Sequence, residues 1–273
     1  MLGTDLVQEL ASAHEVVGVD LPEVDLREPG SLTRALAESK PDAVVNTAAF
    51  TRVDDCEAQR DLAFAVNGDG AGNLARACAA AGARLIHIST DYVFGGDGVR
   101  PWREDDPTAP RGVYAQSKHA GEQAIARELE DGAWTTVRTQ WLFGKNGPNF
   151  VEAILRQVKP GARLRVVADQ RGRPTWTRDL ARGLRWILET ERSHGYVNVA
   201  NDGEATWHEF AEAIARATGV DDVQVAPIAT ADAARPAPRP AYSVLDLGKF
   251  RSIAGRLLPD WRAALDGYLR ERA

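Results

Sequence analysis

The sequence predicts an α/β protein built on a doubly wound parallel sheet, followed by a smaller C-terminal region. Two observations predict this fold class. Short apolar runs alternate with helical patterns through the first half of the chain, which is the rhythm of consecutive strand–helix–strand units. The apolar runs are nearly continuous, as expected of strands that helices cover on both faces. With 273 residues, the chain is long enough for one large domain or two smaller ones.

The expected elements of the first half follow one another in a regular order. Each strand is a short apolar run, and each helix repeats apolar residues at three- and four-residue spacing. The expected strands are 15–20 (EVVGVD), 42–49 (DAVVNTAA), 84–90 (RLIHIST) and 135–141 (TTVRTQW). The expected helices are 4–13, 31–39, a long stretch near 61–81, and 114–130. Pro29 precedes the second helix, in a place typical of a helix's first turn.

The second half is organised differently. We expect an amphipathic helix at 174–190, a strand at 195–201 that returns to the sheet, and a helix at 206–219. Residues 229–240, rich in alanine and proline, look like an extended loop. We therefore divide the chain into residues 1–145 and a smaller region, 146–273, some of whose segments return to the sheet.

Composition and charge exclude several classes of protein. The net charge of −6 argues against sequence-independent nucleic-acid binding. No apolar run approaches the roughly 18 residues of a membrane span, and the N-terminus lacks the pattern of a signal peptide. Cys56 and Cys78 form no C-x-x-C motif, and the histidines lack metal-ligand spacing. We expect a cytoplasmic protein with no nucleic-acid or membrane partner.

Candidate functional residues gather where the expected strands end. In a parallel sheet, ligands bind beyond the carboxyl ends of the strands. The polar segments there are Asp20, 46–51 (NTAAFT), 89–94 (STDYVF) and 138–141 (RTQW). Asp20 follows Gly3 by 17 residues, nearly the spacing at which an acid binds the adenosine ribose of a dinucleotide. The alternative is a strand-end aspartate that caps a turn.

Tyr114 and Lys118 form a second candidate pair. They stand four residues apart in an expected helix, so both side chains lie on one face. A phenol beside an ammonium has a lowered pKa and gives up its proton more readily. The alternative interpretation is a solvated helix face.

The segment ISTDYVFGG (88–96), followed by Tyr114-x-x-x-Lys118, resembles the extended short-chain dehydrogenase/reductases. Within them, the chain is similar to the dTDP-4-dehydrorhamnose reductases over nearly its whole length. The other segments that carry the resemblance are 41–57, 101–122, 138–144, 149–150, 169–181 and 206–211. The resemblance implies a Rossmann-like dinucleotide-binding domain at 1–145 and a mainly nucleotide-sugar-binding region at 146–273. It also implies reduction, with NADPH or NADH, of the 4-keto group of dTDP-4-dehydrorhamnose, a dTDP-4-keto-6-deoxyhexose, to dTDP-L-rhamnose.

The resemblance assigns the chemistry to three residues. Tyr114 gives a proton to the ketone oxygen, while the nicotinamide cofactor gives a hydride to the carbon. Lys118 stabilises the tyrosinate and holds the nicotinamide ribose, and Thr90 hydrogen-bonds the carbonyl oxygen as charge develops on it. Tyr92 stands where sugar-nucleotide 4,6-dehydratases place a glutamate, which favours a simple reductase.

The same resemblance implies two sets of binding residues. The cofactor contacts are Gly3, Asp20, Asp25, Leu26, Ala48, Ala49, Thr51, Tyr114 and Lys118. The substrate contacts are Thr90, Tyr92, Trp141 and Asn149. Candidates for pairing with the substrate's diphosphate, or else solvated surface charges, are Arg235, Arg239 and Lys249. Asp20 should repel a 2′-phosphate, which favours NADH, although the family often accepts both cofactors.

Two departures from the family carry expectations of their own. The family begins with a strand and G-x-x-G-x-x-G, of which only Met1-Leu2-Gly3 has a counterpart here. We therefore expect a misplaced start or a truncated chain, and weakened cofactor binding that about 10–15 upstream residues would restore. We also expect the strands at 15–20 and 42–49 to stay apart rather than pair directly.

The second departure concerns a metal. Some family members bind Mg²⁺ at a dimer contact, where this chain has Asp5, Arg178 and Arg182. Arginines cannot ligate a cation, which takes oxygen ligands. We therefore expect no metal site, and a monomer or a weak homodimer.

Two other functions stay open at this point. One is a 4-ketoreductase that makes another dTDP-deoxysugar, because the sequence does not fix which face of the ketone meets the nicotinamide. The other is a non-catalytic subunit on the same fold, similar to the regulatory β subunit of methionine adenosyltransferase. The presence of Thr90, Tyr114 and Lys118 favours an enzyme over such a subunit.

Overall fold

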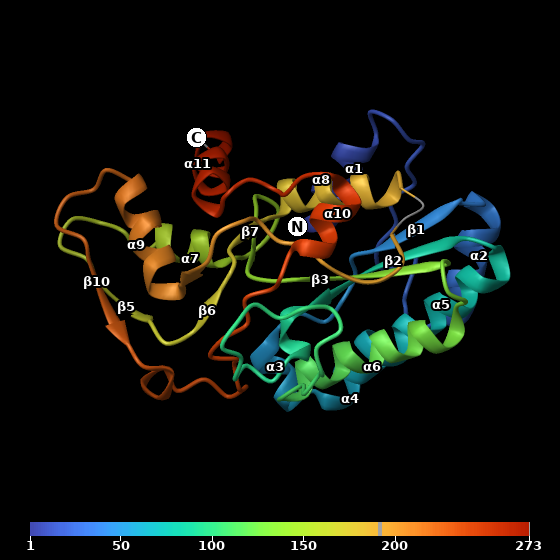
Figure 1. Cartoon of the computed structure of the whole chain (residues 1–273), viewed down its shortest axis with the longest axis horizontal. Helices are drawn as coiled ribbons and strands as arrows, with labels where there is room; N and C mark the ends of the chain where they lie inside the picture. Colours follow the sequence, from blue (N-terminus) through green and yellow to red (C-terminus); the bar gives the residue numbers. More distant parts are fainter. Residues whose placement is uncertain (191–192, 273) are drawn as a thin grey trace.

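A computed structural model describes residues 1–190 and 193–272. Within these residues, four strands form a parallel sheet in the order β1–β2–β3–β8 (Figure 1). The strands are β1 (Ala43–Asn46), β2 (Arg84–Thr90), β3 (Trp134–Thr139) and β8 (Gly195–Asn198). The register sets Thr90 opposite Thr139, so the carboxyl ends of β2 and β3 lie at the same edge of the sheet.

Helices cover both faces of this sheet, as the continuous apolar strands predict. One face is covered by α2 (Pro29–Ser39), α5 (Gly70–Ala81) and α6 (Val113–Glu128). The other is covered by α1 (Leu2–Leu10), α8 (Thr177–Leu188) and α10 (Gly248–Ala254). Neighbouring residues of β2 show the division, because Leu85 packs in the first core and Ile86 in the second. The predicted doubly wound α/β class is confirmed.

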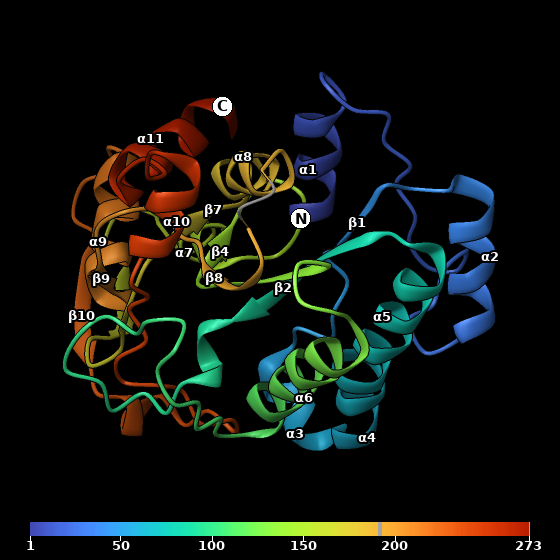
Figure 2. The same ribbon diagram turned by 45° about the vertical axis from the view of Figure 1, so that its right-hand side comes forward.

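A second group of elements packs beside the sheet (Figure 2). It consists of α7 (Phe150–Leu155), β5 (Arg163–Val167), α9 (Trp207–Ala217), β10 (Gln224–Ile228) and α11 (Trp261–Arg272). Its core is aromatic, with Phe143 between Phe210 and Tyr268. Two short pairs link it to the sheet, β4 (Leu142–Phe143) with β7 (Thr175–Trp176), and β6 (Arg171–Gly172) with β9 (Ala205–Thr206). The division at residue 145 stays a prediction.

The long helix expected near 61–81 is interrupted. The chain forms α3 (Val53–Ala58), α4 (Arg60–Phe64), a π-helical turn η1 (Ala65–Asp69) and then α5. At Gly70, a Cβ atom would lie 2.8 Å from the Cβ of Leu26, so only glycine lets these segments approach so closely. Apolar spacing alone does not reveal such a turn. Two 3₁₀ turns, η2 (Asp91–Val93) and η3 (Thr230–Ala233), complete the element order.

The strand expected at 15–20 is not formed, and that prediction is wrong. Val17 and Val19 are 63% and 56% exposed, and the segment pairs with no strand of the described chain. A strand needs a hydrogen-bonded neighbour, and β1 is paired only with β2 in this part of the structure. Within the described residues, 15–20 and 42–49 do not pair directly, but the expected gap between two strands is not formed, because 15–20 is not a strand.

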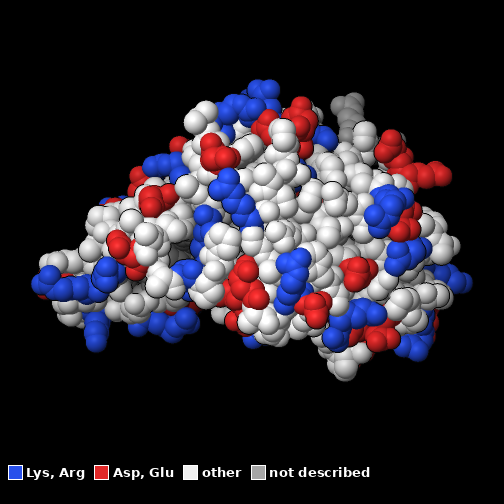
Figure 3. All heavy atoms as spheres, turned by 90° about the horizontal axis from the view of Figure 1, so that it is seen from below, with Lys and Arg blue, Asp and Glu red and all other residues white. Residues whose placement is uncertain are grey.

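The surface carries both signs of charge. On the face shown in Figure 3, Lys and Arg side chains are interspersed with Asp and Glu side chains. Among residues 1–190 and 193–272, no helix is both long and apolar enough to cross a membrane.

Candidate active site

The site lies at the carboxyl ends of β2 and β3, next to the start of α6. Thr90 ends β2 and accepts a hydrogen bond from the backbone N–H of Tyr92, at 3.2 Å, which turns the chain into η2. Gly112 precedes α6 with a φ of +80°, a conformation that favours glycine. The N–H of Val113 then donates to Oε1 of Glu57 at 2.8 Å. These local contacts direct the first turn of α6, which carries Tyr114, toward the end of β2.

Three of the expected site residues meet here. The rings of Tyr92 and Tyr114 pack edge to face, with centroids 5.8 Å apart. Burial raises the pKa of Tyr114, and a hydrogen bond with Thr90 opposes the rise. The hydroxyl of Thr90 donates to Oδ1 of Asp91 at 3.0 Å. A proton donor, a hydroxyl and a buried carboxyl group are therefore contiguous.

Lys118 lies one turn further along α6 and is buried. Its Nζ donates to the backbone oxygen of Ile88 at 2.7 Å and lies 3.2 Å from Nε2 of His87. Burial lowers the pKa of Lys118 to about 8, and the charge of Glu122 opposes this change. The pKa of Tyr114 is raised rather than lowered, and besides burial the groups that shift it are Thr90, Asp91 and Cys56. Within the described chain, the prediction that Lys118 lowers the pKa of Tyr114 is therefore wrong. Loss of hydration, which disfavours phenolate and ammonium alike, decides both values.

The segment after β1 is fixed beside Lys118 by two asparagines. Oδ1 of Asn46 accepts from the N–H of Ala48 at 3.0 Å. Asn67, buried in η1, exchanges two hydrogen bonds with the backbone of Phe50, at 2.8 and 3.0 Å. Its Nδ2 also donates to Oγ of Ser117 at 3.0 Å. Ala48, exposed, and Ala49, half-buried, are thus held at the edge of the sheet by Asn46, which belongs to the candidate segment 46–51, and by Asn67, which was not predicted.

The residues expected near the pyrophosphate come together. A Cβ atom on Gly3 would lie 3.0 Å from Oγ1 of Thr47, so the start of α1 passes close to the segment after β1. Within the described chain, no side chain caps the N-terminus of α1, and a helix N-terminus attracts anions. The residues present here fit a nicotinamide dinucleotide at its pyrophosphate. Thr51 is exposed at the end of the same segment.

The residues expected near the adenosine are mixed in character. Asp20 is exposed, and its Oδ1 accepts from the N–H of Leu21 at 2.8 Å, so it caps a turn. The carboxylate of Asp25 is held by Arg27, at 2.6 to 3.1 Å, and this hydrogen bonding holds its pKa below the usual range. Leu26 packs against Gly70. The structure therefore gives Asp20 and Asp25 intramolecular partners.

On the opposite side of the site, Trp141 adopts a backbone φ of +48°, which is unusual for a bulky residue. Its ring stacks on that of Trp207, with centroids 3.6 Å apart and planes at 10°. A Cβ atom on Gly172 would lie 2.6 Å from the indole, so the ring is confined between Gly172 and Trp207. Trp207 was not predicted, because its role depends on a contact between segments far apart in sequence.

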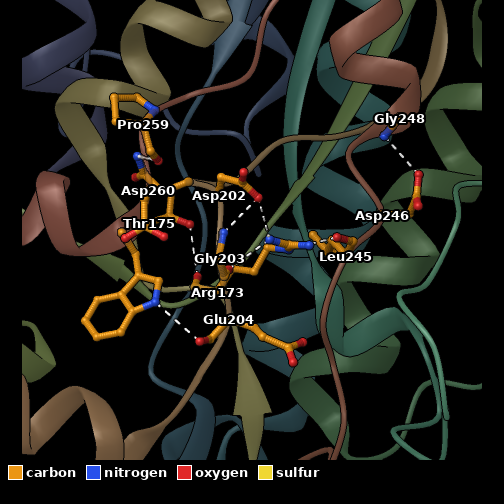
Figure 4. Close-up of polar contacts among 12 residues, drawn as sticks. Arg173, Thr175, Asp202, Gly203, Glu204, Leu245, Asp246, Gly248, Pro259 and Asp260 are labelled. Carbon is orange, nitrogen blue, oxygen red and sulfur yellow. Dashed lines mark hydrogen bonds and ion pairs between the residues drawn. The ribbon is translucent and has the colours of Figure 1, made fainter.

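Arg173 contacts Leu245, Asp202 and Gly203, which come from separate parts of the chain (Figure 4). Its guanidinium donates to the backbone oxygens of Leu245 and Gly203, at 2.9 and 2.8 Å, and pairs with Asp202 at 3.2 Å. The backbone N–H of Arg173 donates to Oε1 of Gln140 at 3.0 Å. Arg173, half-buried, thus ties together three segments that are far apart in sequence.

Two other residues expected to bind substrate, Asn149 and Lys249, are bonded within the protein. Asn149 is the N-cap of α7, and its side-chain atoms bond to Glu152, Gly144 and Gly147. Lys249 donates to backbone oxygens at the amino end of β8, the far edge of the sheet, so its assignment to the diphosphate is wrong. Lys249 is half-buried and bonded to the backbone, so the alternative of a solvated surface charge does not describe it either.

Arg239, by contrast, lines a cavity of about 310 Å³ together with Tyr92 and Gly96. Its guanidinium makes two hydrogen bonds to Asp54, at 3.0 and 2.9 Å. Arg235 is exposed and pairs with the same carboxylate at 3.4 Å. Of the three candidate cations, Arg239 is the one placed beside Tyr92.

The positions considered for a metal carry other contacts. Asp5 accepts hydrogen bonds from Thr177 and Asn146, Arg178 pairs with Glu271, and Arg182 pairs with Asp179. Within the described ranges, no group of three or more His, Cys, Asp or Glu side chains is arranged to hold a metal ion.

Comparisons with known proteins agree on one family. The family described as "RmlD substrate binding domain" matches residues 1–273. A Streptomyces griseus protein named dTDP-4-dehydrorhamnose reductase is 43% identical over 270 residues, 97% of this chain and 88% of the relative. A Streptomyces antibioticus protein named as a probable dTDP-4,6-dihydroxy-2-methyloxan-3-one 4-ketoreductase is 41% identical, over 97% of this chain and 90% of the relative.

A solved structure has the same fold. The crystal structure of dTDP-4-dehydrorhamnose reductase from Bacillus anthracis in complex with NADP is 34% identical, with a TM-score of 0.93. The match covers 99% of this chain and 95% of that one.

Proposed function

Because this chain belongs to the RmlD substrate binding domain family, we propose that it reduces the 4-keto group of dTDP-4-dehydrorhamnose to dTDP-L-rhamnose with NADPH or NADH. The observation that carries the proposal is the convergence of Thr90, Tyr114 and Lys118 at one edge of the sheet. A ketone reductase needs a proton donor, a group that polarises the carbonyl and a group that holds the cofactor's ribose, and these three side chains supply them.

The nicotinamide, when bound, supplies the hydride for the ketone carbon. Tyr114 donates its phenolic proton to the ketone oxygen. Thr90 lies close enough to Tyr114 to influence its pKa, and its hydroxyl hydrogen-bonds the same ketone oxygen and orients the carbonyl. The buried, low-dielectric surroundings strengthen both hydrogen bonds to the developing charge.

Cofactor and substrate are proposed to approach the site from opposite sides. The cofactor's nicotinamide ribose lies on Lys118 and its pyrophosphate on Gly3 and the start of α1, with Ala48, Ala49 and Thr51 alongside. Its adenosine lies toward Asp20, Asp25 and Leu26. The hexose lies between Tyr92 and Trp141, whose rings suit the apolar face of a sugar. Arg239, beside Tyr92 in the cavity, faces the nucleotide diphosphate; Asn149 is the least supported of the proposed contacts, because its side chain caps α7.

The direct test is turnover of dTDP-4-dehydrorhamnose with NADH and with NADPH, with the product identified by NMR. We expect oxidation of the nicotinamide together with formation of dTDP-L-rhamnose. Binding of a nicotinamide without turnover would instead indicate a non-catalytic subunit on the same fold. A chain that neither binds nor turns over these ligands would contradict the proposal.

A second candidate is reduction of a different dTDP-4-keto-6-deoxysugar. The identity of 41% to a protein named as a probable 4-ketoreductase supports this candidate. The configuration at C4 depends on which face of the ketone meets the nicotinamide. NMR coupling constants of the product's ring protons distinguish the two outcomes.

We further propose that the enzyme acts in the cytoplasm as a monomer or weak homodimer. Both cysteines are buried and free, and burial raises the pKa of Cys56 to about 11 and of Cys78 to about 12, which suits a reducing compartment. Sedimentation analysis over a range of concentrations checks the oligomeric state. A tight dimer at low concentration would contradict this part of the proposal.

A further inference from the structure

A buried chain of polar contacts runs beneath the active site, from β1 through β2 to α6. Nδ2 of Asn46 lies 3.0 Å from Nδ1 of His87, and Nε2 of His87 lies 3.2 Å from Nζ of Lys118. All three side chains are at least 95% buried. The mechanism above does not use Asn46 or His87, so their arrangement needs a separate explanation.

The backbone fixes the orientation of the Asn46 amide. Its Oδ1 accepts from the N–H of Ala48 at 3.0 Å, so the amide nitrogen faces His87 as a donor. A ring nitrogen that accepts a hydrogen bond carries no proton. The hydrogen-bond network therefore assigns the lone pair of His87 to Nδ1 and its proton to Nε2.

This tautomer directs an N–H group at Lys118. An ammonium has three protons and no lone pair, so it cannot accept that hydrogen bond. A neutral amine has a lone pair for Nε2–H and keeps protons to donate to the backbone oxygen of Ile88, 2.7 Å away. The network is thus fully satisfied only when Lys118 is the amine, and one donor faces another when Lys118 is the ammonium.

We propose that His87 is a positioning residue for Lys118, whose amine form it stabilises by donating Nε2–H, so that Lys118 releases its proton more readily than a lysine facing an acceptor. The proposal rests on the proposed function only in placing Lys118 at the cofactor. His87 does not touch the reacting atoms and acts through Lys118 alone.

The other ionisable groups around Lys118 act in known directions. Glu122, one turn along α6, favours the ammonium, but it is held by two hydrogen bonds from Arg138 of β3 and lies 3.5 Å from His119. Tyr114 lies one turn before Lys118, and Asp91 follows β2. Burial, together with the charge of Lys118, lowers the pKa of His87 well below its usual value, so the imidazole stays neutral while Lys118 titrates.

The tautomer is tested first, because this measurement needs no variant and no turnover. Two-bond ¹H–¹⁵N correlation spectra of the ¹⁵N-labelled full chain report which ring nitrogen of His87 is protonated. We expect protonation at Nε2 across the pH range in which Lys118 titrates. Protonation at Nδ1, or of both nitrogens, overturns the proposal even if the enzyme is active.

The second test measures the alkaline limit of kcat in His87→Gln. The glutamine oxygen can accept from the ammonium, so the limit should move to higher pH by about one unit. His208→Gln is the control, because His208 bonds to the backbone oxygen of Val225, far from Lys118 in the fold, and its limit should not move. A lower kcat with an unchanged pH limit in His87→Gln would mean that His87 only fills space, and would overturn the proposal.

Discussion

The hydroxyl of Thr90 donates a hydrogen bond to the carboxyl group of Asp91, 3.0 Å away, and Asp91 is almost completely buried. The other oxygen of Asp91 has no hydrogen-bond partner within residues 1–190 and 193–272. In the part of the chain that the structure describes, no arginine or lysine compensates its charge in the way that Arg138 compensates Glu122. An ionised carboxylate in this position is therefore costly, and the protein responds by holding its proton.

Asp91 should make stability depend on pH. Burial raises its pKa to about 7, well above that of an unfolded chain, so the folded state binds more protons between about pH 4 and 7. Its contribution to the free energy of unfolding is present below pH 4 and is lost as the pH rises, by up to about 4 kcal/mol. Asp91→Asn keeps an oxygen for Thr90 and should remove this loss. Urea denaturation of wild type and Asp91→Asn at pH 5 and pH 8 measures this loss. The same change in unfolding free energy between the two pH values in both proteins would contradict the prediction.

Tyr114→Phe should abolish most of the turnover. Only a hydroxyl is lost, so the fold and the packing against Tyr92 should persist, while kcat falls by roughly 10²-fold or more. Steady-state kinetics measure the loss, and thermal denaturation checks that the melting temperature is unchanged. Full activity in this variant would remove Tyr114 from the mechanism.

Lys118→Met should weaken cofactor binding and change the alkaline limit of activity. The side chain loses its charge and its hydrogen bond to Ile88 while keeping most of its volume. NADH titration followed by fluorescence should show the weaker binding, and Lys159→Met, at an exposed position, serves as the control. Identical binding and pH profiles in parent and variant would show that Lys118 does not contact the cofactor.

Glu122 and Arg138 form a buried ion pair whose loss should be severe. Burial alone would raise the pKa of Glu122, but the nearby His119 and the hydrogen bonds from Arg138 hold it below the usual range. Arg138→Met leaves this carboxylate unpaired and should cost about 3–5 kcal/mol of unfolding free energy. Arg76→Met, which breaks an exposed pair with Glu128, should cost less than about 1 kcal/mol.

The pH dependence of this pair has the opposite sign to that of Asp91. Because the pKa of Glu122 is lowered, its stabilisation is present above its unfolded pKa and is lost as the pH falls through the folded value. Urea denaturation of wild type and Arg138→Met, repeated over a range of pH, gives both the loss of unfolding free energy and its pH dependence. A cost for Arg138→Met no larger than that for Arg76→Met would show that the pair is not buried in solution.

The Trp141–Trp207 stack should matter for the sugar more than for the cofactor. Trp207→Leu removes the surface that confines the Trp141 ring and should raise KM for the nucleotide sugar several-fold, with KM for NADH little changed. Trp207→Phe keeps a flat ring and should largely rescue KM. Coupled indole transitions in circular dichroism report the stack directly, and their absence in the wild type would refute it.

The sequence predicted most of the sheet, because burial on both faces leaves a strong apolar signal at 84–90 and 195–201. It failed at 15–20, where the same signal is present but no hydrogen-bonded neighbour completes a strand. It identified Thr90, Tyr114 and Lys118 through a known motif. It missed His87, Asn67 and Trp207, since their importance comes from contacts across 17 to 66 residues of sequence that no local pattern records.

Asn67 gives the site a property that no single contact reveals. One amide is bonded both to Phe50, in the segment expected to line the cofactor, and to Ser117, the neighbour of Lys118. These two walls therefore cannot fluctuate independently, and opening one strains the other. In hydrogen exchange, the amide of Phe50 should be as slow as those in the middle of α6, although it belongs to a loop, and a ligand bound at either wall should slow exchange at both.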